Sequence, residues 1–240
     1  MIIDFAVRPP YKSFLSLFPL YKTPPPAKSW RHVSPWSYET EPAPSRVRQS
    51  MPLFIAEMDE AGISQAVIIG RQTNSSKFGR VSNDDIAALD QSYPGRFHLV
   101  GGVALTDVPA AVAEAERLVT ERGFKGITVR PGWHEPPMVA DDERFYPLYE
   151  KCQALGTILV VTFSLFMGPD LNYVTPVRLQ RVAAAFPELL IVVAHGGWPY
   201  VMEFLGVAFM HPNIWLAPDF YVFRQGLPGA SHFVEAANFY

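Results

Sequence analysis

A histidine at the end of an apolar run is the residue of this chain best suited to moving a proton. Residues 189–194 read Leu-Leu-Ile-Val-Val-Ala, and His195 and two glycines follow them. Such a run is typical of a strand buried on both faces of a parallel sheet, and α/β proteins keep their reactive groups where such strands end. Because imidazole titrates near neutral pH, we expect His195 to act as a general acid or base. The alternative is an ordinary core histidine whose ring nitrogens are hydrogen-bonded and which takes no part in chemistry.

Asp219 is the second candidate for proton transfer. It comes just after another short apolar segment, Asn213-Ile-Trp-Leu, which predicts a strand over residues 213–217. A carboxylate at this place would orient His195 or act as a base itself. The alternative is an ordinary turn aspartate after Pro218.

Three arginines end three further predicted strands. Arg8, Arg71 and Arg130 follow the apolar residues of strands near 2–8, 65–70 and 125–130. Parallel strands in a barrel end at one face, so these guanidinium groups should surround one pocket and bind a carboxylate or a phosphate bidentately. Thr162, at the end of a strand over 157–162, should face the same pocket. The alternative is that each arginine pairs with a nearby acid or lies in solvent.

Aromatic residues and a second histidine fall near these positions. Trp198 and Trp133 would form walls for an aromatic or unsaturated substrate, although tryptophans more often serve in packing. His134 lies on the loop after the strand that Arg130 ends and should reach the pocket. We find no Gly-x-Ser-x-Gly and no Gly-x-x-x-x-Gly-Lys, which disfavours a serine hydrolase and a phosphate-binding P-loop.

The elements that position these residues alternate between strand and helix. Predicted strands from the third to the sixth begin about every 30 residues, which is the rhythm of a (β/α) barrel. A doubly wound sheet is the alternative, but no Gly-x-Gly-x-x-Gly follows the first strand. The full set of predicted strands is 2–8, 65–70, 97–103, 125–130, 157–162, 189–195 and 213–217. Predicted helices cover 45–61, 83–92, 108–122, 142–155, a stretch from 176, 199–210 and 229–240.

Seven predicted strands are one fewer than a closed (β/α)8 barrel requires. An open barrel would expose two parallel strand edges, which is a poor arrangement for a globular protein. We therefore expect one further βα unit and a terminal helix, about 40–50 residues, to be missing from this chain. Residues 1–240 are otherwise predicted to form a single barrel domain.

A proline-rich segment interrupts the regular pattern near the start. Residues 9–44 hold nine of the 23 prolines together with seven aromatic residues. Long loops of this kind are often functional lids, so we expect the segment to cover the mouth of the barrel or to reach a neighbouring subunit of a homo-oligomer.

Composition narrows the class of partner. The chain has 240 residues, 49% of them hydrophobic, and a formal net charge of −3. This balance does not favour nucleic acid or an anionic membrane surface, and no apolar run is long enough to span a bilayer. Cys152 is the only cysteine, so no internal disulfide can form, and a reducing cytoplasm is the expected compartment.

Three segments carry a family resemblance. They are the opening Ile2-Ile3-Asp4, the segment Met58-Asp59-Glu60-Ala61-Gly62-Ile63 before the second strand, and Val193-Ala194-His195-Gly196-Gly197. In this order and rhythm the chain resembles the amidohydrolase-2 family over its whole length. The resemblance implies a distorted TIM barrel and an activity among metal-dependent hydrolases, lactonases and aminocarboxymuconate-semialdehyde-type decarboxylases and hydratases.

The chain departs from this family at the metal ligands. The family's first strand usually reads Asp-x-His-x-His, whereas Ala6 and Arg8 stand at the histidine positions here. Thr162 falls on or beside the strand-five histidine, and only His195 matches a ligand. Catalytic zinc needs three protein ligands, and the fixed charge of Arg8 would repel a cation. We therefore expect no metal and no other cofactor, with zinc or another divalent ion the alternative if the family site survives.

Two classes of function follow. The first is an amidohydrolase-related hydrolase that cleaves an amide, ester or lactone of a small organic acid, with decarboxylation or hydration as a variant. The second is a barrel without metal chemistry that only binds a ligand.

Overall fold

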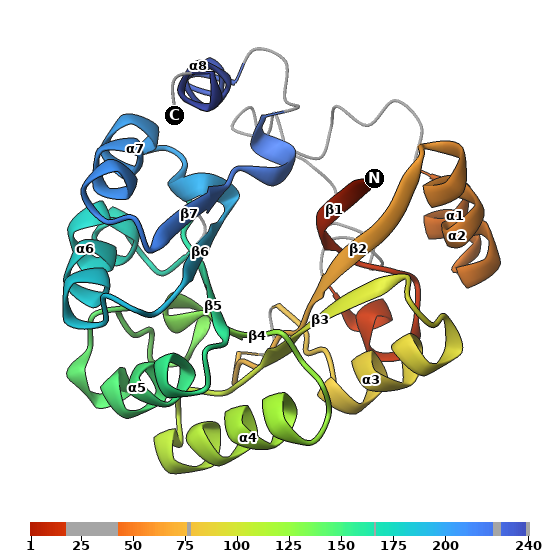
Figure 1. Cartoon of the computed structure of the whole chain (residues 1–240), viewed down its shortest axis with the longest axis horizontal. Coiled ribbons are helices and arrows are strands. Elements are labelled where there is room, and N and C mark those ends of the chain that lie inside the picture. Colours follow the sequence, from red (N-terminus) through yellow and green to blue (C-terminus); the bar gives the residue numbers. More distant parts are fainter. Residues whose placement is uncertain (18–42, 76–77, 166, 223–226, 239–240) are drawn as a thin grey trace.

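Seven parallel strands form one curled sheet in the order β1-β2-β3-β4-β5-β6-β7. The computed structural model describes residues 1–17, 43–75, 78–165, 167–222 and 227–238. Figure 1 shows the strands around the centre and the helices outside them, as in a barrel rather than in a doubly wound sheet. The strands are β1 Ile2–Val7, β2 Ile63–Ile69, β3 Phe97–Gly102, β4 Gly126–Val129, β5 Ile158–Thr162, β6 Ile191–Ala194 and β7 Ile214–Ala217.

The helices connect successive strands and pack on the outer face of the sheet. Several begin at the caps expected from sequence: the side chains of Ser82 and Asp107 accept hydrogen bonds from backbone N–H groups in the first turns of α3 and α4. The helices are α1 Pro44–Arg48, α2 Met51–Glu60, α3 Asn83–Ser92, α4 Val108–Thr120, α5 Tyr146–Ala154, α6 Pro176–Ala185, α7 Val201–Met210 and α8 Ser231–Ala237.

The first helix differs from its prediction. A single helix over residues 45–61 is wrong, because Gln49 adopts a left-handed conformation with φ 48° and ends α1. Ser50 then starts α2 by accepting a hydrogen bond from the backbone N–H of Leu53. Pro52 at the start of α2 has no N–H to donate, which suits a new helix and not the interior of a longer one.

The two faces of the sheet carry two separate apolar clusters. The large cluster lies between the strands and the surrounding helices and includes Ile127, Val129 and Val161. A smaller cluster on the inner face contains Ile69, Val100, Val160 and Ala194. Side chains alternate between faces along a strand, so the positions between the outer-core residues point into the barrel.

β1 and β7 are the edge strands of the sheet and flank its open side (Figure 1). Trp215 of β7 is 61% exposed, and Ile2 and Ile3 of β1 are exposed as well. The seven strands are those expected from the sequence.

Part of the proline-rich segment 9–44 can be placed. A 3-10 turn over Lys12–Ser16 buries Phe14 completely, and the backbone N–H of Ser13 bonds Asp85 of α3 at 3.2 Å. Residues 18–42 lie outside the described residues, so the lid and the subunit contact expected of them stay predictions. Within the described ranges, no helix is long and apolar enough to cross a membrane.

Candidate functional site

The predicted site residues lie at one end of the sheet. Thr162 is the last residue of β5, and Arg8, Arg71, Arg130 and His195 each stand one or two residues beyond β1, β2, β4 and β6. Asp219 follows β7 after Ala217 and Pro218. Since all strands are parallel, these residues share the carboxyl-terminal face, where barrel proteins carry their chemistry.

His195 sits in a tight turn directly after β6. The strand is shorter than predicted and ends at Ala194, because His195 has φ 69° and leaves the extended conformation. Gly196 and Gly197 follow with φ 61° and 80°. A Cβ at Gly197 would collide with the ring of Phe204, so only glycine lets the chain turn here. The turn lifts the imidazole out of the strand and onto the face.

Asp219 holds both the backbone and the side chain of His195. Its Oδ2 lies 2.7 Å from the imidazole Nδ1 and accepts a hydrogen bond from the backbone N–H of His195 at 3.1 Å. Both side chains are largely buried, with 13% and 8% exposed. A carboxylate beside Nδ1 favours the tautomer that carries the proton there, and leaves Nε2 as the acceptor. The pair has the form of a general base and the group that orients it.

Two aromatic rings support this pair. The ring of Tyr221, which is buried, lies edge-on to the imidazole of His195 at 5.6 Å. The ring of Trp198 stacks on the same tyrosine ring, with 5.5 Å between the ring centres. Trp198 also donates its Nε1–H to the carbonyl of Pro228 at 3.0 Å. The predicted aromatic wall at Trp198 is therefore beside His195, with one face covered by Tyr221.

The arginines of β2 and β4 converge on a second tryptophan. The guanidinium carbons of Arg71 and Arg130 lie 4.7 and 5.6 Å from the ring centre of Trp133, and Phe78 stacks on this ring at 4.2 Å. Arg71 Nη1 donates to the carbonyl of Phe78 at 2.5 Å, and Arg130 Nη1 donates to that of Gly70 at 2.7 Å. These contacts fix two planar cations side by side.

The electrostatics of this arginine pair are unfavourable in the absence of an anion. Each side chain is only 4% exposed. Burial, and then the charge of Arg8, lower the pKa of Arg130 to about 9, while burial, Arg130 and Arg8 lower that of Arg71. In the described part of the chain, no ion pair joins either guanidinium to a carboxylate, whereas Arg178 pairs with Asp141 at 2.6 Å. Burial therefore disfavours the charged form of both guanidinium groups, and no described carboxylate offsets this cost.

Thr162 lies between the arginines and the histidine. Its backbone pairs with Ala194, the residue before His195, and its buried hydroxyl oxygen has no hydrogen-bond partner in the part of the chain that the structure describes. Asp4 of β1 is within electrostatic reach of the His195–Asp219 pair. Burial, and then the charge of Asp219, raise its pKa. Sequence reasoning did not select Asp4 for the site, nor Tyr221.

His134 is enclosed by protein. It is 1% exposed, and its Nε2 accepts a hydrogen bond from the backbone N–H of Leu105 at 3.5 Å. Burial, followed by the positive charge of Arg80, lowers its pKa to about 4. The imidazole is therefore neutral at physiological pH, and its burial argues for a supporting position over direct contact with substrate.

The donor atoms at the strand ends do not fit the family's metal centre. Across the ranges that the structure describes, no group of three or more His, Cys, Asp or Glu side chains is arranged to hold an ion. Ala6 offers no donor, Arg8 is cationic, and Thr162 offers only a neutral hydroxyl. Asp219 already occupies Nδ1 of His195.

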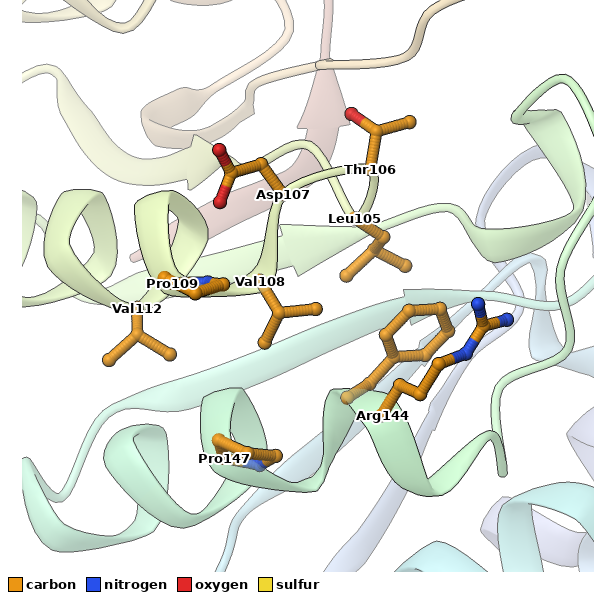
Figure 2. A pocket seen from close by; sticks show the side chains of 9 residues that line it. Leu105, Thr106, Asp107, Val108, Pro109, Val112, Arg144 and Pro147 are labelled. Carbon is orange, nitrogen blue, oxygen red and sulfur yellow. The ribbon is translucent and has the colours of Figure 1, made fainter.

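A pocket of about 860 Å³ lies between helices outside the sheet, at the end of the barrel where β3 and β4 finish. Figure 2 shows it between the start of α4 and the residues that lead into α5. Its lining is mostly apolar and contains none of the predicted site residues. The lining residues are Leu105, Thr106, Asp107, Val108, Pro109, Val112, Arg144, Phe145 and Pro147. Without a cluster of reactive groups, it is not the candidate active site.

Comparison with known proteins agrees with the fold and identifies the family. A TIM-barrel protein of unknown function from Bordetella bronchiseptica has a similar structure, with a TM-score of 0.86 and 37% identity, covering 99% of this chain and 81% of that one. The chain is thus a TIM-barrel protein. The family model for amidohydrolases matches residues 3–238, and the chain belongs to the amidohydrolase family.

Curated relatives in this family are enzymes. A 2-keto-4-carboxy-3-hexenedioate hydratase from a Sphingobium species is 26% identical over 54% of this chain and 43% of its own length. A gamma-resorcylate decarboxylase from a Polaromonas species is 25% identical over 66% of this chain and 59% of its own length. The chain spans about half the length of the curated relatives it matches.

Proposed function

We propose that this member of the amidohydrolase family is a hydrolase of a small carboxylate-bearing amide, ester or lactone that works without a bound metal. The observation that carries the proposal is the arginine pair: two buried guanidinium groups share the face of His195 and have no carboxylate partner among the described residues. Uncompensated buried cations are costly, so a ligand carboxylate is the group that would complete this site.

The reaction would proceed by general-base catalysis. Nε2 of His195 takes a proton from water as the water oxygen adds to the substrate carbonyl carbon. Asp219 stabilises the imidazolium that forms, since its Oδ2 lies 2.7 Å from Nδ1. The imidazolium then returns the proton to the leaving nitrogen or oxygen as the bond to carbon breaks. Water is consumed, and the histidine ends in its starting state.

The arginine-bound carboxylate would serve as the handle of the substrate. Arginine contacts stabilise a carboxylate in the ground state, and losing this charge as CO₂ would forfeit them. This argues against decarboxylation of that same group. The curated relatives favour the alternative, a decarboxylase or hydratase, in which His195 protonates carbon or activates water toward a double bond. A decarboxylase would then need a second carboxylate beyond the arginines.

The experiment is a turnover screen of matched compounds. Lactones, esters and amides with a free carboxylate are compared with their neutral methyl-ester or carboxamide analogues, and aromatic and unsaturated dicarboxylic acids are included to detect CO₂ release or hydration. We expect turnover only of the acids. Equal turnover of acids and neutral analogues would contradict the proposal, and binding of acids without any turnover would assign the barrel a binding role alone.

Metal dependence is tested on the same preparation. Elemental analysis should give zinc and manganese well below one ion per chain, and treatment with a chelator should leave turnover unchanged. Stoichiometric metal, together with loss of turnover on chelation and recovery on its return, would show that the proposed metal-free reaction is wrong.

A further inference from the structure

We propose that Thr128 is a further substrate-binding residue, whose hydroxyl donates a hydrogen bond to the carboxylate held by Arg71 and Arg130. This inference rests on the proposed function and places the bound anion deeper in the barrel than the strand ends. Thr128 belongs to β4, two residues before Arg130.

The alternation of β4 points Thr128 into the barrel. Its neighbours Ile127 and Val129 both belong to the outer core, so the threonine and Arg130 share the inner face. On one side Thr128 pairs with Gly102 of β3, which has no side chain to separate β4 from β2. Arg130 reaches across this position to the carbonyl of Gly70, just beyond β2. The threonine and the two arginines therefore border one region of the inner face.

Several buried donors in this region have no acceptor. Thr128 is only 1% exposed, and its hydroxyl finds no hydrogen-bond partner among the described residues. Nε of Arg71 has none there either. The hydroxyl of Thr162 is in the same state. By contrast, the buried threonine at the opposite end of β5, Thr157, donates to the carbonyl of Lys125 at 3.0 Å. Buried polar groups are nearly always paired, so this set indicates a missing acceptor.

A carboxylate matches this set of donors. It accepts several hydrogen bonds through two oxygens, whereas guanidinium groups only donate and a hydroxyl can turn its hydrogen toward either oxygen. On the other side of Thr128 the register continues to Val160 and Val192, whose apolar side chains would contact the body of the ligand. One carboxylate oxygen would thus face Thr128 while the other faces Arg130.

The test measures binding of benzoate by calorimetry in Thr128→Val, which keeps the shape of the side chain and removes the hydroxyl. We expect the affinity for benzoate to fall by about tenfold, a typical loss for a hydrogen bond to a charged group. Thr128→Ser, which restores the hydroxyl, should bind as the wild type does. The free Thr128→Val protein should melt no lower than wild type, because its buried hydroxyl has no partner to lose.

Thr157→Val is the matched control. It removes a hydroxyl that is hydrogen-bonded, so it should lower the melting temperature and leave benzoate binding unchanged. Benzamide is the neutral comparison for benzoate, and inorganic phosphate is the competing anion. Phosphate binding more tightly than benzoate would overturn the assignment to a carboxylate.

The failures are distinguishable. If wild type binds benzoate no better than benzamide, the proposed function fails. If wild type binds benzoate, Arg130→Met loses it and Thr128→Val keeps it, only the role of Thr128 is wrong. Loss of binding in Thr128→Ser, with binding kept in Thr128→Val, would mean that the methyl packing and not the hydroxyl matters, and would also overturn it.

Discussion

Oδ2 of Asp219 contacts His195 at two points, the imidazole Nδ1 at 2.7 Å and the backbone N–H at 3.1 Å. Both residues have positive φ angles, 43° for Asp219 and 69° for His195. Such backbone conformations are uncommon outside glycine and are retained where the surrounding structure demands them. The double contact fixes the orientation of the ring relative to the turn that presents it.

Asp219→Asn should abolish most of the turnover and spare substrate binding. Asparagine tolerates a positive φ, so the turn persists, but a neutral amide no longer stabilises the imidazolium. We expect kcat to fall by about a hundredfold or more, with little change in KM. Steady-state kinetics on an acid that the wild type turns over would measure this.

Asp142→Asn is its control. Asp142 binds Arg144 at the turn before α5, in the outer layer of helices, and in the described part of the chain it contacts none of the candidate site residues, so this variant should keep full kcat. An Asp219→Asn protein with wild-type kcat would remove Asp219 from the mechanism.

His195→Asn should be inactive while folding normally. Asparagine adopts a positive φ more readily than alanine does, so His195→Ala carries a backbone penalty of about 1 kcal/mol that His195→Asn avoids. For a chain of this size, we expect His195→Ala to melt about 2–4 °C below His195→Asn. Both should bind the acid without turning it over. Turnover by His195→Asn would show that the imidazole is dispensable.

Arg130→Met should weaken anion binding and raise the stability of the free protein. A hydrogen bond to a charged group contributes about 1.5–3 kcal/mol, so the affinity for benzoate should fall by about 10- to 150-fold. Removing a buried cation without a carboxylate partner relieves its desolvation and its repulsion from Arg71, which should increase the melting temperature.

Arg117→Met is the control for this change. Arg117 pairs with Glu114 within α4 at 2.8 Å, and this half-exposed ion pair should contribute about 1 kcal/mol. Benzoate binding should be unaffected. A destabilised Arg130→Met protein that still binds benzoate normally would assign Arg130 a structural role.

His134 should make the protein acid-sensitive. Its pKa is about 4 in the folded state, below the ordinary value of 6.5. Between these values the unfolded chain binds the proton and the folded protein does not, so stability is lost as the pH falls from about 6.5 to 4. At about 1.4 kcal/mol per pKa unit, this amounts to about 3 kcal/mol.

His134→Gln should remove this dependence. Urea unfolding at pH 7 and pH 4.5 should show a smaller loss of stability in the variant than in wild type. His232→Gln changes an exposed histidine beside Glu235 and serves as the control, so it should lose as much stability at pH 4.5 as wild type does. If His134→Gln and wild type lose the same free energy of unfolding between pH 7 and pH 4.5, the buried imidazole does not control the stability at low pH.

Some of the site was predictable because it depends on strand ends. The spacing of apolar runs located Arg8, Arg71, Arg130, Thr162 and His195, and a parallel sheet puts all such ends on one face. Thr128 left a signal as well, a polar residue within the run Gly-Ile-Thr-Val, but strand pattern alone does not say whether a buried hydroxyl has found a partner.

Contacts between distant segments were not predictable. Trp133 was considered as a substrate wall or as an ordinary packing residue, yet its ring contacts Phe78 and both guanidinium groups. No spacing rule brings a loop residue near position 78 onto a loop residue near 133. His134 was expected in the pocket, but the fold encloses it.

The sequence by itself determined the barrel, its strand order and the face on which charged residues gather, because hydrophobic periodicity and chain chirality are local properties that repeat along the chain. Tertiary structure alone decided that Asp219 binds His195, that the arginines lack a carboxylate partner in the described chain, and that Thr128 is unpaired. Ion pairing and desolvation depend on which side chains meet across the fold within a few ångströms, and a one-dimensional pattern does not encode those distances.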